Sequence, residues 1–104
     1  MSIDISGYST ISIPELQKRL KQIENARADV FQYFWISDAG DAHPAVVKRY
    51  QEKGFSVRSS FLVHRNDEDG NQYIREIPQI FYDSFGPGEL RMYDNDFNYV
   101  PPRR

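Results

Sequence analysis

The fold is decided by a stretch that begins Val30-Phe31-Gln32-Tyr33-Phe34-Trp35-Ile36 and ends at Arg65. Its opening residues are aromatic or β-branched with almost no polar interruption, and the run is too short for a typical helix. Such a run is typical of a strand that is covered on both faces, so we predict a strand at residues 30–36. A short polar loop over residues 37–43 follows it.

A helix is predicted at residues 44–53, because the sequence carries signals for both of its ends. Pro44 suits the first helical turn, where a backbone N–H would have no partner in any case. Asp41 or His43 can cap that end. Gly54 suits the left-handed conformation that often terminates a helix, and residues 55–65 are then typical of a second strand.

A strand, a helix and a strand joined by short loops usually form a right-handed crossover between parallel strands. We predict this unit for residues 30–65. Parallel strands end at the same edge of a sheet, and ligands often bind beyond that edge. The edge would hold polar side chains from two loops: Asp38, Asp41, His43, His64, Arg65 and Asp67.

An acidic turn with a glycine, residues 66–71, follows the second strand and predicts an antiparallel hairpin over residues 55–77. Residues 72–77 would then be an edge strand, because Pro78 has no N–H to donate to a ladder. Residues 79–85 are expected to be extended, and a short helical turn is the alternative.

A second helix is predicted near the N-terminus. Ser12 and Glu15 form a capping box, and Leu16, Leu20 and Ile23 follow at helical spacing. The predicted fold is therefore α+β with an α/β-like crossover, a small single-layer mixed sheet of three to five strands with two helices. We expect residues 1–104 to form a single domain in which residues 94–104 are an extended C-terminal tail.

Composition narrows the class of protein. The absence of cysteine favours a reducing, cytoplasmic setting. The net charge of −2 lacks the basic excess of a nucleic-acid binder. A nucleic-acid ligand is therefore not expected, although Arg58, Arg65 and Arg75 could serve one beside exposed strand aromatics. No apolar run approaches the ~20 residues that cross a bilayer, and no secretion signal is evident, so no membrane partner is expected.

None of the common catalytic, phosphate-binding or metal-binding motifs is present, and no cofactor or metal is expected. The acidic turn lacks the ligand spacing of a calcium loop. The alternative function is a small hydrolase or metal-binding domain in which His43, His64, Asp38 and Asp41 meet at the carboxyl edge of the sheet. Histidine can act as acid, base or ligand near neutrality, but both histidines also suit ordinary structural positions.

Aromatic and acidic residues are interspersed near the C-terminus. Tyr and Phe are prominent in protein interfaces, and acidic residues among them suit a basic partner such as a nuclease. The structural alternative is that these aromatics close the core. The predicted partner-binding residues are the acidic turn and this C-terminal set: Asp67, Glu68, Asp69, Tyr82, Asp83, Tyr93, Asp94, Asp96, Phe97 and Tyr99.

These features predict a small cytoplasmic protein-binding module, which could be an inhibitor, an immunity-type protein or an adaptor. Its partner would be another protein, with a basic surface. A homodimer is an additional expectation, because the edge strand predicted at residues 72–77 could pair with its own copy. The enzyme alternative depends on topology, since the two histidines share an edge only if the two central strands are parallel.

Overall fold

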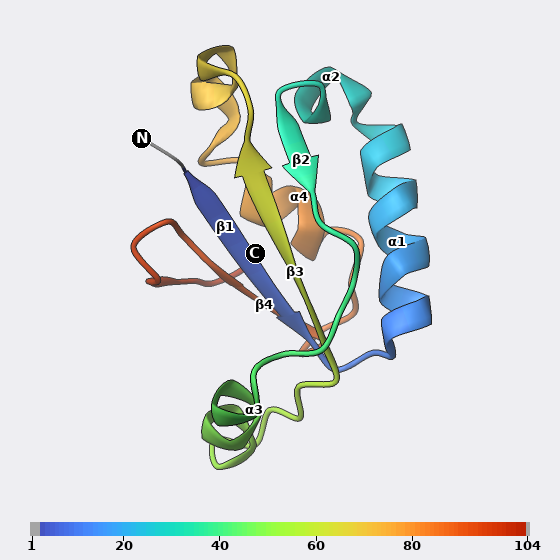
Figure 1. The fold of residues 1–104 in the computed structure, drawn as a ribbon, viewed down its shortest axis with the longest axis vertical. Coiled ribbons are helices and arrows are strands. Elements are labelled where there is room, and N and C mark those ends of the chain that lie inside the picture. The colour runs from blue at the N-terminus through green and yellow to red at the C-terminus, as the bar shows by residue number, and fades with distance from the viewer. Residues whose placement is uncertain (1–2, 104) are drawn as a thin grey trace.

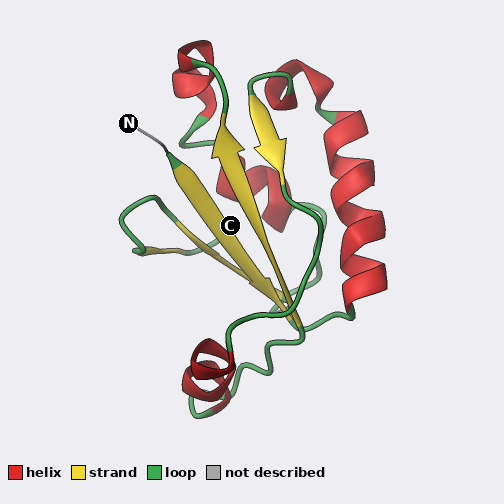
Figure 2. Cartoon of the chain, in the orientation of Figure 1, coloured by secondary structure: helices red, strands yellow, loops and turns green. Residues whose placement is uncertain are grey.

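The computed structural model describes residues 3–103, which form one antiparallel sheet with helices on one face and beyond both ends (Figures 1 and 2). The sheet order is β2-β3-β1-β4-β5, and every neighbouring pair of strands is antiparallel. The strands are β1 (Asp4–Ser9), β2 (Phe34–Ile36), β3 (Ser59–Arg65), β4 (Leu90–Tyr93) and β5 (Tyr99–Val100). The helices are α1 (Ile13–Ala26), α2 (Ala28–Phe31), α3 (Pro44–Gln51), the 3-10 helix η1 (Glu68–Tyr73) and α4 (Ile77–Tyr82). No helix within residues 3–103 is long and apolar enough to cross a membrane.

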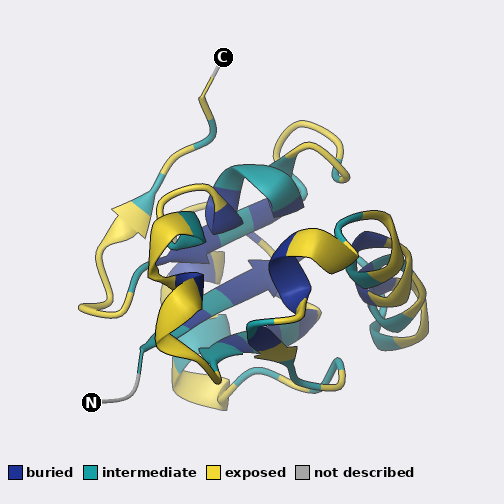
Figure 3. Ribbon diagram, turned by 90° about the horizontal axis from the view of Figure 1, so that it is seen from above, coloured by how far each residue is buried: buried dark blue, intermediate teal, exposed yellow. Residues whose placement is uncertain are grey.

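The α+β class is confirmed, and so is the predicted N-terminal helix. The Ser12 side chain accepts a hydrogen bond from the Glu15 N–H at 3.4 Å, which caps α1. Leu16, Leu20 and Ile23 are buried along one side of α1, while its other side is exposed (Figure 3). The capping box and the apolar spacing therefore identified α1 correctly.

The main core lies between α1, α2, α4 and one face of the sheet. Phe81 of α4 is fully buried at its centre, with ring centroids 4.9 Å from Phe61 and 5.6 Å from Phe31. Gly7 of β1 leaves room for the Phe61 ring, because a Cβ atom there would lie 2.3 Å from it. Residues of the strands complete this face: Ile5, Phe34, Val63, Leu90 and Met92.

The opposite face of the sheet is covered only at one end, by α3 and the segment after it (Figure 1). Tyr50, Phe55 and Val57 pack there against Tyr8 and Tyr93. Burial raises the pKa of both the Tyr8 and the Tyr50 hydroxyls above the ordinary value for tyrosine. The rest of this face has no covering layer, and that fact defines the candidate site.

The predicted parallel crossover over residues 30–65 is wrong, and the sheet is not mixed. Val30 and Phe31 belong to the short helix α2, and only residues 34–36 form a strand, which pairs antiparallel with β3. The physical reason is the helix between them: α3 has eight residues and spans about 12 Å. It lies beyond the end of the sheet and turns the chain around, instead of carrying it back along the face (Figure 1).

The predicted hairpin over residues 55–77 is also wrong, and with it the edge strand proposed for a homodimer. Residues 68–73 form η1, and the Asp67 side chain caps it by accepting from the Asp69 N–H at 2.9 Å. Gly70 packs closely on Tyr33 and Phe34, where a Cβ would lie 2.9 Å from the Tyr33 Cβ. Pro78 lies in the first turn of α4. The residues directly after it, 79–82, were expected to be extended, but they are helical.

Candidate functional site: the open face of the sheet

Two rows of paired side chains cross the sheet on the face opposite the main core, where α3 covers only one end. Because side chains at paired positions share a face, the register aligns Trp35 with His64 and His64 with Asp4. The His64 Nδ1 and Asp4 Oδ1 atoms are 2.6 Å apart. A second row crosses β3, β1, β4 and β5 in the order Leu62, Ser6, Tyr93 and Tyr99. We call the surface formed by these two rows and by Phe97 the open face.

Exposed aromatic rings lie at both margins of the open face. Trp35 is 53% exposed on the edge strand β2, while Phe97 and Tyr99 are 56% and 48% exposed at the opposite edge. The Tyr93 ring lies 5.6 Å from the Phe97 ring and 5.8 Å from the Tyr99 ring. These three are the large hydrophobic side chains exposed in the described part of the chain. Aromatic side chains gathered on one uncovered face are typical of a protein-binding surface.

The turn between β4 and β5 is built to present Phe97. The Asp94 carboxylate accepts hydrogen bonds from the backbone N–H groups of Asp96 and Asn98, both at 2.9 Å. Phe97 has a φ of 64°, a left-handed conformation that is costly for a bulky side chain. A strained aromatic residue that remains more than half exposed contributes little to the core, which favours a functional reason for its presence.

Replacing Phe97 with glycine should therefore separate stability from binding. Glycine adopts a positive φ without a steric cost, so Phe97→Gly should leave stability unchanged or raise it by up to ~1 kcal/mol. The same change should weaken partner binding, because the ring is lost. Urea unfolding and a binding isotherm on the same sample check both effects. A variant that is clearly destabilised and binds normally would contradict the role given to Phe97.

Carboxylates lie beside this aromatic surface. Asp96 is exposed in the β4–β5 turn, next to Phe97. Asp38 and Asp41 line a shallow hollow over β1 and β3, together with Ser6 and Tyr8. The open face and its surroundings therefore combine exposed aromatic rings with negative charge.

The remaining predicted contact residues lie elsewhere. The Tyr82 hydroxyl donates to the Val100 C=O at 2.5 Å and accepts from the Met92 N–H at 2.9 Å. It therefore bridges β4 and β5, and burial raises the pKa of Tyr82 to about 12. Asp83 accepts a hydrogen bond from Gln79. The acidic group Asp67, Glu68 and Asp69 lies at the start of η1, beyond the end of β3 (Figure 1).

Of the predicted partner-binding residues, the structure brings five together around the β4–β5 turn: Tyr93, Asp94, Asp96, Phe97 and Tyr99. Sequence reasoning missed Trp35, which was assigned to a strand buried on both faces. Since the side chains of a strand alternate, the polar Ser37 and the apolar Phe34 and Ile36 could have indicated that Trp35 points away from the core. The Asp4–His64 pair had no signal in the sequence.

The histidines do not share an edge of the sheet. His43 caps α3, where its Nδ1 accepts from the Ala45 N–H at 3.1 Å. The loop before it pairs at Gly40 with Ser60, and His64 lies further along β3 by roughly 13 Å at the rise of a strand. Within residues 3–103 no three His, Cys, Asp or Glu side chains are grouped to hold a metal ion. The geometry expected for a His/Asp centre at a common edge is therefore not formed.

A small α+β domain with an uncovered, aromatic and acidic sheet face has the construction of a protein-binding module. A family model described as CDI System Immunity Component matches residues 1–98. The chain therefore belongs to the CDI System Immunity Component family, and it is a protein-binding module of the immunity type.

A solved structure supports the same assignment. A chain in the CdiA-CT/CdiI toxin and immunity complex from Burkholderia pseudomallei is 26% identical in sequence, with a TM-score of 0.82. The similarity covers 93% of this chain and 95% of that chain. None of the curated proteins compared with the chain matches it.

Proposed function

We propose that this chain neutralises the CdiA-CT toxin domain of its own CDI system by binding that domain over the open face of the sheet. The similar chain from Burkholderia pseudomallei comes from a complex of a toxin with its immunity protein, which supports a toxin as the partner. The observation that carries the location is the exposure of Trp35, Phe97 and Tyr99 on the sheet face that α3 covers only at one end. A cytoplasmic site of action is part of this proposal.

The proposed partner surface is basic. Asp38, Asp41 and Asp96 surround the exposed rings, and the chain carries a net charge of −2. Opposite charges across an interface speed association and exclude wrong partners more than they raise affinity. The acidic start of η1, residues 67–69, extends the same negative charge beyond the end of β3.

Reversing one of these charges tests the proposal. Asp96→Lys should lower the association rate constant with the CdiA-CT domain by roughly 3- to 10-fold, with the largest difference at low salt. Glu24→Lys makes the same change of charge on α1, away from the open face, and should alter the rate much less. Stopped-flow association at two ionic strengths measures both variants.

Two results would contradict the proposed function. If the CdiA-CT domain of the same system fails to bind the unmodified chain, the toxin is not the partner. If Glu24→Lys slows association as much as Asp96→Lys does, the toxin does not approach the open face.

A further inference from the structure

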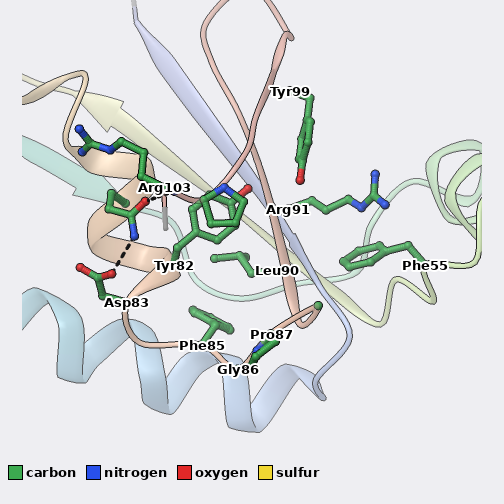
Figure 4. A pocket seen from close by; sticks show the side chains of 13 residues that line it. Phe55, Tyr82, Asp83, Phe85, Gly86, Pro87, Leu90, Arg91, Tyr99 and Arg103 are labelled. Carbon is green, nitrogen blue, oxygen red and sulfur yellow. Dashed lines mark hydrogen bonds between the residues drawn. The ribbon is translucent and has the colours of Figure 1, made fainter.

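A cleft of about 280 Å³ lies beside the open face, between α4, the turn at residues 86–88 and the strands β4 and β5 (Figure 4). Arg91 of β4 reaches from its wall, between the side chains of Tyr99 and Phe55. The guanidinium carbon lies 4.9 Å from the Phe55 ring centroid, 5.5 Å from that of Tyr99 and 5.9 Å from that of Tyr50. Three aromatic rings therefore hold one cationic side chain in place.

Aromatic rings contact the flat faces of a guanidinium group. Its N–H donors lie in the plane of the group and point outward, so they remain available for hydrogen bonds. No hydrogen bond or ion pair to the Arg91 side chain occurs among residues 3–103. No buried side-chain nitrogen of the described chain lacks a partner, so the Arg91 donors reach solvent. Arg19 and Arg27, by contrast, are both paired with carboxylates, at 3.1 Å.

We propose that Arg91 binds a carboxylate side chain of the toxin domain. A planar guanidinium group with its N–H edge exposed is suited to bidentate binding of a carboxylate. The surrounding rings fix its orientation before binding, which lowers the entropy lost when the pair forms. This inference rests on the proposed function and adds one acidic contact to an otherwise basic partner surface.

A single carboxylate fits the site better than a polyanion. Asp83 and Arg103 both line the cleft, and Asp96 is exposed in the turn before Tyr99. A nucleic acid or another extended anion that reached both arginines would also approach these two carboxylates, whereas one protein side chain can contact Arg91 alone. The pair would also set the register of the toxin along β4, because three aromatic rings hold the Arg91 guanidinium group in place.

The first test compares substitutions of Arg91 with a matched control. Arg91→Gln should raise the Kd for the CdiA-CT domain by roughly 10- to 100-fold, and Arg91→Lys should recover only part of that loss because lysine has no planar fork. Arg49→Gln removes a charge from the exposed side of α3 and should change the Kd less than about twofold. Thermal unfolding of each variant shows whether the aromatic contacts survive.

The second test needs no toxin. Titration of the unmodified chain with sodium acetate should shift the Arg91 Nε–Hε NMR signal saturably, and sodium chloride at equal ionic strength should not. If the toxin binds Arg91→Gln as well as the unmodified chain, the inference is wrong and the proposed function stands. If the toxin binds neither protein, the proposed function fails, and absence of the acetate shift then overturns the carboxylate site as well.

Discussion

Replacing Trp35 and Tyr99 together with alanine is expected to weaken the binding of the CdiA-CT domain by at least ~100-fold. Aromatic residues that a partner buries fully often cost 2 kcal/mol or more when truncated, which is roughly 30-fold for each. The two rings lie on opposite edge regions of the sheet, in β2 and β5, so one partner that covers the open face contacts both. Isothermal titration calorimetry measures the affinity.

The same double variant should remain folded. Both side chains are about half exposed, and truncating exposed groups outside the core usually changes stability by only a few tenths of a kcal/mol. A matched control is Lys21→Ala with Gln22→Ala, two exposed positions on α1. Normal binding by the Trp35/Tyr99 variant, or equal loss in the α1 control, would show that the toxin does not bind the open face.

Replacing Phe81 with alanine is expected to destabilise the protein by about 3–5 kcal/mol. Phe81 is fully buried, and its ring contacts Phe61 of the sheet and Phe31 of α2, so the cavity left behind would lie where three elements meet. Typical domains have only about 5–15 kcal/mol of total stability, so much of the protein would be unfolded in mild denaturant.

Urea unfolding measures the loss of stability. A second phenylalanine-to-alanine substitution, at an exposed position, serves as the control. Phe97→Ala removes the same atoms from a ring that is more than half exposed, and it should cost less than about 1 kcal/mol. A loss below about 1 kcal/mol for Phe81→Ala would mean that α4 does not pack on the sheet as described.

Local signals in the sequence predicted the local structure well. Ser12 and Glu15 marked the start of α1, and Gly54, whose φ is 82°, follows α3 as the predicted left-handed stop. Each of these predictions depended on residues less than about one turn of helix or one hairpin apart.

The sense of β2 relative to β3 could not be predicted in this way. It depends on whether α3 covers the sheet face or lies beyond its end, and Tyr50, Phe55 and Val57 would be apolar in either arrangement. Because the parallel arrangement was assumed, His43 and His64 were placed at one edge, and Trp35 was assigned to the core.

The sequence contains a signal for the helix α4 that the prediction of an extended segment did not use. Ile77-Pro78 repeats the Ile13-Pro14 pattern that begins α1, with proline in the first helical turn in both cases. Pro78 was instead interpreted as the end of a strand, since proline suits both positions. The apolar residues after it, Ile80 and Phe81, then contact the core from a helix.

Cross-saturation NMR of the deuterated chain bound to the protonated CdiA-CT domain tests the central claim most directly, because it maps the contact surface without any substitution. The open face should lose signal at the Trp35 indole and at the amides of residues 94–99, while the amides of α1 keep their intensity. Loss of signal concentrated on α1, with the Trp35 indole unaffected, would contradict the assignment of the open face as the toxin-binding surface.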